Sequence, residues 1–102
     1  MTDPAFCRTE MLLGSEALDR LKAARVAVFG VGGVGGYVVE TLARAGVGAL
    51  DLFDADTVSE SNRNRQLLAL CSTLGRPKAE VAAERVRDIN PACAVTPHVL
   101  FY

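Results

Sequence analysis

Apolar residues follow two different spacings that alternate along this chain. Short continuous apolar runs at residues 26–29 and 50–53 are typical of strands in a parallel sheet, where both faces are buried. After each run, apolar residues recur every three or four positions, which predicts helices. The order strand, helix, strand, helix predicts an α/β fold: a Rossmann-like doubly wound parallel sheet.

The predicted helices can be bounded by their flanking residues. The first should follow the strand at 26–29 and end at Gly46; its apolar positions are Val34, Val38, Val39, Leu42 and Ala45. The second should start near Pro77 and end before Asn90-Pro91; its buried positions are Ala79, Ala82, Ala83, Val86 and Ile89.

Weaker patterns lie outside these elements. Ser15 is a candidate N-cap for a short helix that turns Leu18 and Leu21 inward, after an N-terminal arm. Leucines at 67, 68 and 70 suggest another short helix. Residues 94–96 and 99–101 are candidate strands.

Glycines cluster where the first strand gives way to the first helix. Gly30, Gly32 and Gly35 fit the spacing G-x-G-x-x-G, and Gly33 is an additional glycine inside it. The first glycine allows a tight turn, the second lets a phosphate approach the backbone, and the third lets the helix pack closely on its strand. The helix start then offers free N–H groups to an anion. This predicts a phosphate-binding loop, and the alternative is a glycine-rich turn that binds nothing.

Polar residues follow the second strand, where open α/β sheets bind their ligands. Asp54 ends that strand at the position of the ribose-binding carboxylate of a nucleotide-binding βαβ unit; alternatively it caps a turn. Residues 56–66 include two arginines and two asparagines. Arginine can grip a phosphate with two hydrogen bonds, so this segment is a second candidate for nucleotide contact, the alternative being a solvated loop.

Composition narrows the class of protein. The 102 residues suit one domain, and a net charge of −1 indicates neither a nucleic-acid surface nor a membrane surface. The three cysteines are widely spaced without a C-x-x-C pair, which predicts an intracellular, cytoplasmic protein with free thiols. His98 lacks metal-ligand neighbours and is expected to be an ordinary strand-end residue. We therefore expect no metal site in this chain, no signal peptide and no membrane partner.

Several blocks together resemble the ubiquitin-activating-enzyme-like (ThiF-type) adenylyltransferases. The blocks are Gly30-Val-Gly-Gly-Val-Gly35, Ala45-Gly-Val-Gly48, Asp54-Ala-Asp56, Ser61-Asn-Arg-Asn-Arg-Gln66, Gly75-Arg-Pro-Lys-Ala79 and Ile89-Asn-Pro91. Their order and spacing match the family from residue 8 to about residue 96. Within the family, Arg8-Thr-Glu-Met-Leu-Leu-Gly14 followed by Glu16-Ala-Leu18 is most similar to the tRNA threonylcarbamoyladenosine dehydratases.

The resemblance implies an ATP- and Mg²⁺-dependent enzyme that activates a carboxylate of a modified adenosine in tRNA and then closes it into a ring. It implies that glycines 30, 32, 33 and 35 line the ATP phosphates and that Asp54 holds the ribose. It also implies that Asn62 and Arg65 contact the nucleotide, that Lys78 neutralises charge at the α-phosphate, and that Arg8 reaches the neighbouring subunit's site in a homodimer. The catalytic group would be Arg65, Lys78 and Arg8, a set of fixed cations suited to charge that builds up at phosphorus.

The family's metal-binding aspartate and second-substrate region lie beyond residue 102. We therefore expect an N-terminal part of a ThiF-type domain, with an arm and helix at 1–24 and a nucleotide-binding βαβ core at 25–102. Such a part should leave one edge of the first strand unpaired, self-associate or fold poorly, and be catalytically weak or inactive. Three alternatives stay open: activation of a sulfur-carrier protein, an NAD-binding oxidoreductase domain, and an inactive dimerisation module.

Overall fold

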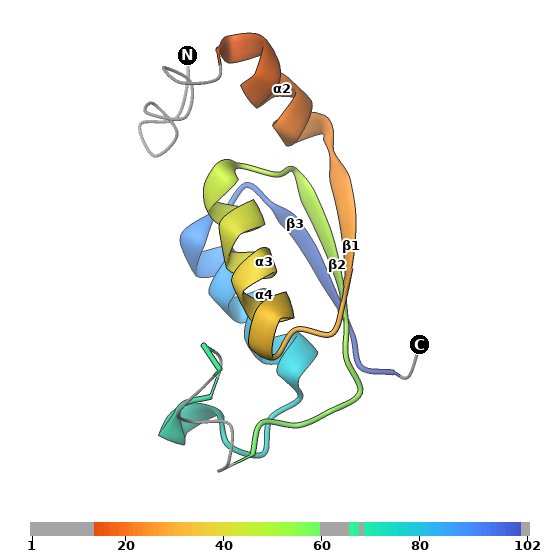
Figure 1. Ribbon diagram of the computed structural model, residues 1–102, viewed down its shortest axis with the longest axis vertical. Coiled ribbons are helices and arrows are strands. Elements are labelled where there is room, and N and C mark those ends of the chain that lie inside the picture. Colours follow the sequence, from red (N-terminus) through yellow and green to blue (C-terminus); the bar gives the residue numbers. More distant parts are fainter. Residues whose placement is uncertain (1–13, 60–65, 68, 101–102) are drawn as a thin grey trace.

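The computed structural model describes residues 14–59, 66–67 and 69–100 (Figure 1). In chain order the elements are α2 (Ser15–Ala23), β1 (Arg25–Phe29), α3 (Gly33–Ala45), β2 (Ala49–Phe53), the 3₁₀ turn η3 (Cys71–Thr73), α4 (Lys78–Ile89) and β3 (Ala94–His98). Within the described residues the three strands are parallel, in the order β1-β2-β3. The predicted alternation of strands and helices is confirmed.

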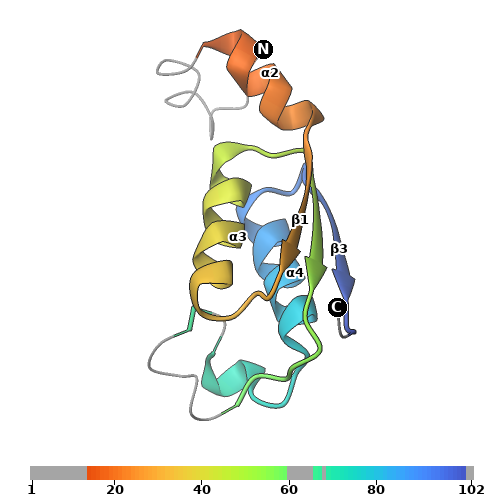
Figure 2. The ribbon, with the colours of Figure 1, turned by 45° about the vertical axis from the view of Figure 1, so that its right-hand side comes forward.

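Helices α3 and α4 cover the same face of the sheet (Figure 2). The side chains that the strands direct toward them form the centre of the core, together with apolar residues of both helices; they include Val28, Leu50, Leu52 and Val95. Burial of this apolar surface is the main force that holds helices and sheet together.

The opposite face of the sheet carries no helix among the described residues (Figure 2). Ala27 is exposed there, and Phe29 is 57% exposed. The prediction that residues 26–29 are buried on both faces is therefore wrong for the part of the chain that the structure describes, because only one face of β1 has a covering layer.

Strand β1 lies at the edge of the sheet. Residues 25–29 pair in register with residues 49–53 of β2, and within the described chain no strand pairs with the other side of β1. The predicted unpaired edge is confirmed. Because such an edge offers free backbone groups to another chain, self-association stays a prediction.

The inward side of α3 differs from the one its apolar repeat suggested. Gly36, Val39 and Ala43 are buried, whereas Val34 and Val38 are 80% and 42% exposed. Leu42 packs against the core. The helix ends at Gly46, as predicted: this residue has a φ of 94°, and its N–H reaches back to the carbonyl of Ala43.

Helix α4 buries the predicted positions, with Ile89 packed at the margin of the core. It begins at Lys78, with Pro77 as its N-cap residue. On α2, Leu18 is buried and Leu21 half-buried.

Three local predictions were wrong. Gly14, with a φ of 85°, is the N-cap residue of α2 in place of Ser15. The turn of helix predicted near Leu67 and Leu70 lies at residues 71–73 instead, because the Thr73 hydroxyl bonds to the backbone of Leu70. The last strand is one element ending at His98, so residues 99–100 do not extend it.

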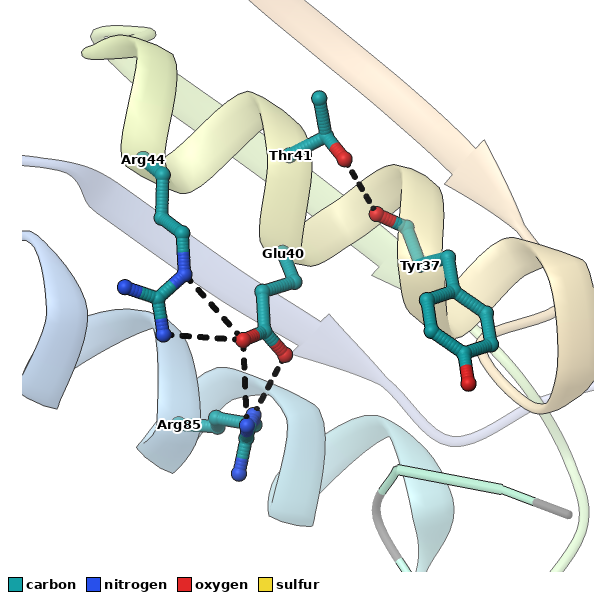
Figure 3. A network of polar contacts seen from close by, with 5 residues as sticks. All are labelled: Tyr37, Glu40, Thr41, Arg44 and Arg85. Atoms are coloured by element: carbon teal, nitrogen blue, oxygen red, sulfur yellow. Dashed lines mark hydrogen bonds and ion pairs between the residues drawn. The ribbon is translucent and has the colours of Figure 1, made fainter.

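An ion-pair network joins α3 to α4 (Figure 3). The Glu40 carboxylate accepts hydrogen bonds from Arg85 at 2.8 and 3.1 Å and from Arg44 at 2.9 and 3.2 Å. The Arg85 guanidinium is the main reason that the pKa of Glu40 is lowered. Because two cations share one carboxylate, the network fixes the packing of the two helices more firmly than an isolated surface pair would.

A second polar cluster lies on the open face of the sheet. The Asp51 carboxylate accepts two hydrogen bonds from Arg25, at 2.6 and 3.0 Å, and lies 3.2 Å from Nε2 of His98. The His98 ring stacks on Phe53, whose ring in turn stacks on Phe29. His98 is the last residue of β3, as predicted, and the cluster joins all three strands through side chains.

The turn between β1 and α3 depends on a close backbone contact. A Cβ atom at Gly35 would lie 1.7 Å from the carbonyl oxygen of Gly30. Only glycine allows this approach, so the predicted close packing of helix on strand is confirmed at Gly35.

Replacing Asp51 by asparagine should remove a stabilisation that depends on pH. A hydrogen bond from Arg25 is the largest cause that lowers the pKa of Asp51 to about 2, and one from His98 is the second. An aspartate in the unfolded chain has a pKa of about 3.9. The stabilisation is complete above about pH 4 and is lost as the pH falls toward about 2. In urea denaturation at about pH 6, we expect a lower free energy of unfolding for Asp51→Asn than for the wild type. The two free energies should converge at about pH 2. Asp19→Asn, at an exposed position of α2, is the control, and parallel pH curves for Asp51→Asn and wild type would contradict the prediction.

Replacing Gly35 by alanine should destabilise the protein by about 3 kcal/mol or more, because a backbone carbonyl must move to admit the methyl group. Gly75→Ala is the matched control: its φ is 81°, but no atom lies within 4 Å of the added methyl group. Gly75→Ala should lower the free energy of unfolding by about 1–2 kcal/mol, because of its backbone conformation alone. Equal urea midpoints for the two variants would show that the contact at Gly30 does not constrain the turn.

Candidate nucleotide-binding site

Those predicted binding residues that the structure describes gather at one end of the molecule. The carboxyl ends of the strands, the first turns of α3 and α4, and the described part of the connection between β2 and α4 all lie there (Figure 1). In an open α/β sheet this is the end at which ligands bind. Because β1 and β2 are parallel neighbours, residues near 30, 54 and 78 come together at this end of the sheet.

The glycine-rich loop leaves β1 through a turn that two glycines permit. Gly30 and Gly33 have φ values of 85° and 54°, which other residues rarely adopt. The N–H of Gly30 donates to the carbonyl of Phe53 at 2.8 Å, so the loop starts directly beside the end of β2. The tight turn predicted at Gly30 is confirmed, and Gly33 has a conformational reason of its own.

Helix α3 presents an uncapped N-terminus to this loop. Its N-cap residue is Gly32, no side chain caps it, and its first turn contains no acidic residue. The first N–H groups of a helix have no acceptor within the helix, and together with the helix dipole they favour an anion. The arrangement fits a phosphate group.

The carboxylate of Asp54 connects the glycine-rich loop to the segment after β2. One oxygen accepts the backbone N–H of Val31 at 3.0 Å and the other accepts that of Asp56 at 2.8 Å. Asp54 is 8% exposed. The turn-capping alternative therefore describes contacts that are present. A carboxylate has about four acceptor sites, so these two bonds leave room for the predicted ribose contact, which stays a prediction.

Lys78 is the first residue of α4 and is 8% exposed, which is uncommon for lysine. Its backbone N–H donates to the carbonyl of Asp56 at 2.9 Å. Among the described residues its ammonium group forms no ion pair with an acidic side chain. A bound phosphate would supply a counter-charge for this cation.

Three predicted site residues, Arg8, Asn62 and Arg65, lie outside the described residues. The structure therefore brings together the glycines, Asp54 and Lys78. The structure also brings Gln66 against Gly32; this glutamine belongs to the polar segment at 56–66, but the sequence predicts no individual role for it. Its signal in the sequence was weak, since a glutamine after an arginine is ordinary in a solvated loop.

Within the described ranges, no group of three or more His, Cys, Asp or Glu side chains is placed to hold a metal ion. No helix in those ranges has the length and apolar character that crossing a membrane requires. An open pocket of about 240 Å³ lies between α4 and Leu67, Leu70 and Thr73, and none of the predicted site residues that the structure describes lines it.

Known proteins are similar in sequence to most of this chain. Over 97 residues the chain is 50% identical to tRNA threonylcarbamoyladenosine dehydratase of Bacillus subtilis, covering 95% of this chain and 38% of that protein. Over 82 residues it is 49% identical to molybdopterin-synthase adenylyltransferase of Salmonella typhimurium, covering 80% of this chain and 33% of that protein.

A solved structure of a dehydratase is also similar to this chain. The Escherichia coli tRNA N6-threonylcarbamoyladenosine dehydratase TcdA, in complex with ATP, superposes with a TM-score of 0.93 at 47% identity, covering 95% of this chain and 40% of TcdA. The chain thus spans about two fifths of the length of the dehydratases that it matches. The family model of the ThiF family matches residues 6–101. The chain belongs to the ThiF family.

Proposed function

We propose that this chain is the ATP-binding part of an enzyme that adenylates a carboxylate. The observation that carries the proposal is the similarity to ATP-bound TcdA, with a TM-score of 0.93 at 47% identity over 95% of the chain. The glycine-rich loop, the uncapped start of α3 and the buried Lys78 are the features that a polyphosphate requires at this place.

Each predicted residue has a chemical task in this proposal. The glycines and the start of α3 bind the phosphates through backbone N–H groups, and Asp54 accepts a hydrogen bond from the ribose. Asn62 and Arg65 contact the nucleotide. Lys78, Arg65 and Arg8 provide fixed positive charge where negative charge develops during attack by a carboxylate. Mg²⁺ would accompany the ATP phosphates, as the family resemblance implies.

The substrate that we propose is the carboxylate of threonylcarbamoyladenosine in tRNA, which would then be cyclised. The 50% identity to the Bacillus subtilis dehydratase over 95% of the chain favours it. The 49% identity to a molybdopterin-synthase adenylyltransferase favours a second candidate, the C-terminal carboxylate of a sulfur-carrier protein. In both proposed reactions these residues bind the nucleotide, so the choice of substrate depends on the rest of the enzyme.

Two further alternatives lead to different measurements. An NAD-binding oxidoreductase domain would use the glycine-rich loop and Asp54, but it would leave Lys78, Arg65 and Arg8 without a role. A non-catalytic module that serves only dimerisation would bind neither nucleotide, whereas one that senses nucleotides would bind without adenylating a carboxylate. Titration with ATP and with NAD therefore separates these readings.

Binding of ATP should protect the chain against heat. At a concentration about 100 times the Kd, a ligand adds about 2.7 kcal/mol to the free energy of unfolding, and in a domain of this size that raises Tm by several degrees. Lys78→Ala should weaken ATP binding about tenfold or more, because a hydrogen bond to a charged phosphate is lost.

Lys22→Ala, in which an exposed lysine of α2 is removed, is the matched control and should keep the full protection. Tm without nucleotide is recorded for both variants to separate folding from binding. Protection by NAD and not by ATP would overturn the adenylation proposal.

Arg8 should act in the site of a neighbouring subunit within a homodimer. The equivalents of Arg8→Ala and Lys78→Ala, made separately in a full-length relative, should each abolish adenylation. When the two inactive proteins are mixed and allowed to exchange subunits, each mixed dimer regains one intact site, so about a quarter of all sites should be active. Absence of recovery, with subunit exchange verified, would show that the site is not shared.

A further inference from the structure

The side chain of Gln66 lies against the glycine-rich loop. A Cβ atom at Gly32 would be 2.7 Å from Oε1 of Gln66 and 3.1 Å from its Nε2. The carboxamide therefore occupies the place that a side chain at residue 32 would take. Gly32 has an extended φ of −88°, so backbone conformation does not explain a glycine here, whereas contact with Gln66 does.

This contact leaves a polar atom without a partner. Oε1 of Gln66 is buried and has no hydrogen-bond partner among the described residues. Buried polar atoms in folded proteins are nearly always bonded, and an exception is commonly explained by a water, ion or ligand that takes part in function. The position of the carboxamide against Gly32 therefore leaves its oxygen without a hydrogen bond.

The unpartnered oxygen of the Gln66 carboxamide lies beside the uncapped N-terminus of α3. Gly32 is the N-cap residue of this 13-residue helix, and no side chain caps it. Two independent features, the N–H groups at the start of a helix and an unsatisfied carboxamide oxygen, therefore meet at one point. A carboxamide carries two N–H donors as well as its acceptor oxygen, and rotation about its last bond exchanges the two ends within nearly the same volume.

We propose that Gln66 is a nucleotide-contacting residue, which donates an N–H of its carboxamide to a phosphate oxygen bound at the start of α3. The inference rests on the proposed function, because it requires a nucleotide phosphate at the glycine-rich loop. It adds a neutral donor to the cations that the family resemblance implies. It also assigns Gly32 a second task, that of making room for the side chain that contacts the phosphate.

Two substitutions of similar size test this in the 102-residue chain. Gln66→Met keeps an unbranched side chain over Gly32 without a donor, and Gln66→Glu keeps the shape but adds negative charge. Dissociation constants for ATP and for adenosine, measured by titration calorimetry, and Tm without nucleotide are compared with wild type. Thr41→Val is the control: this exposed hydroxyl donates to the carbonyl of Tyr37 within α3 (Figure 3).

We expect Gln66→Met to weaken ATP binding about tenfold or more and Gln66→Glu to weaken it further, with adenosine binding unchanged. Without nucleotide, Tm of Gln66→Met should equal or exceed that of wild type, because the unsatisfied oxygen has been removed. Replacing a residue that only packs against the loop would not weaken ATP binding while leaving Tm unchanged or higher.

The outcomes separate this inference from the proposed function. If wild type binds ATP and Gln66→Met binds it equally well, Gln66 only packs against Gly32 and the inference is overturned, while the proposed function stands. Loss of Tm without nucleotide, or equal loss of ATP and adenosine binding, overturns it as well. If wild type binds adenosine but not ATP, the proposed function fails and the inference fails with it.

Discussion

The carboxylate of Asp54 connects the parts of this structure on which the candidate site depends. It accepts N–H groups from the glycine-rich loop and from Asp56, and the carbonyl of Asp56 accepts the first N–H of α4. One buried side chain thereby links the loop after β1, the segment after β2 and the start of a second helix. Hydrogen bonds to ionised groups are stronger than neutral ones, so this link holds the loop more firmly than backbone pairing alone.

The candidate anion site at the carboxyl end of the sheet consists mostly of backbone. Helix α3 begins with glycines and has neither an acidic side chain in its first turn nor a capping side chain. Backbone N–H groups are already oriented before a ligand arrives, which lowers the entropy that binding must overcome. Lys78, buried at the start of α4, adds positive charge from the other helix that begins at this edge.

The two faces of the sheet differ in what they bury. The face toward α3 and α4 is apolar, whereas the other face carries the cluster of Arg25, Asp51 and His98 beside an aromatic row. The chain spans 38% and 40% of the length of the dehydratases that it matches. A polar cluster of this kind fixes the register of neighbouring strands, since its members come from β1, β2 and β3.

The sequence by itself determined the order of elements, the parallel sheet and the end of the molecule where the site lies. Short apolar runs, helical spacing, and glycine at positions 30 and 35 are local signals, and local sterics enforce them. Which surfaces are covered was decided only by tertiary structure. Val34 and Val38 follow a helical repeat yet are exposed, because α3 turns its glycine and alanine side toward the sheet and α4. Likewise, the contact of Gln66 with Gly32 and the pairing of Asp51 with His98 join residues far apart in the chain, and no local spacing encodes such contacts.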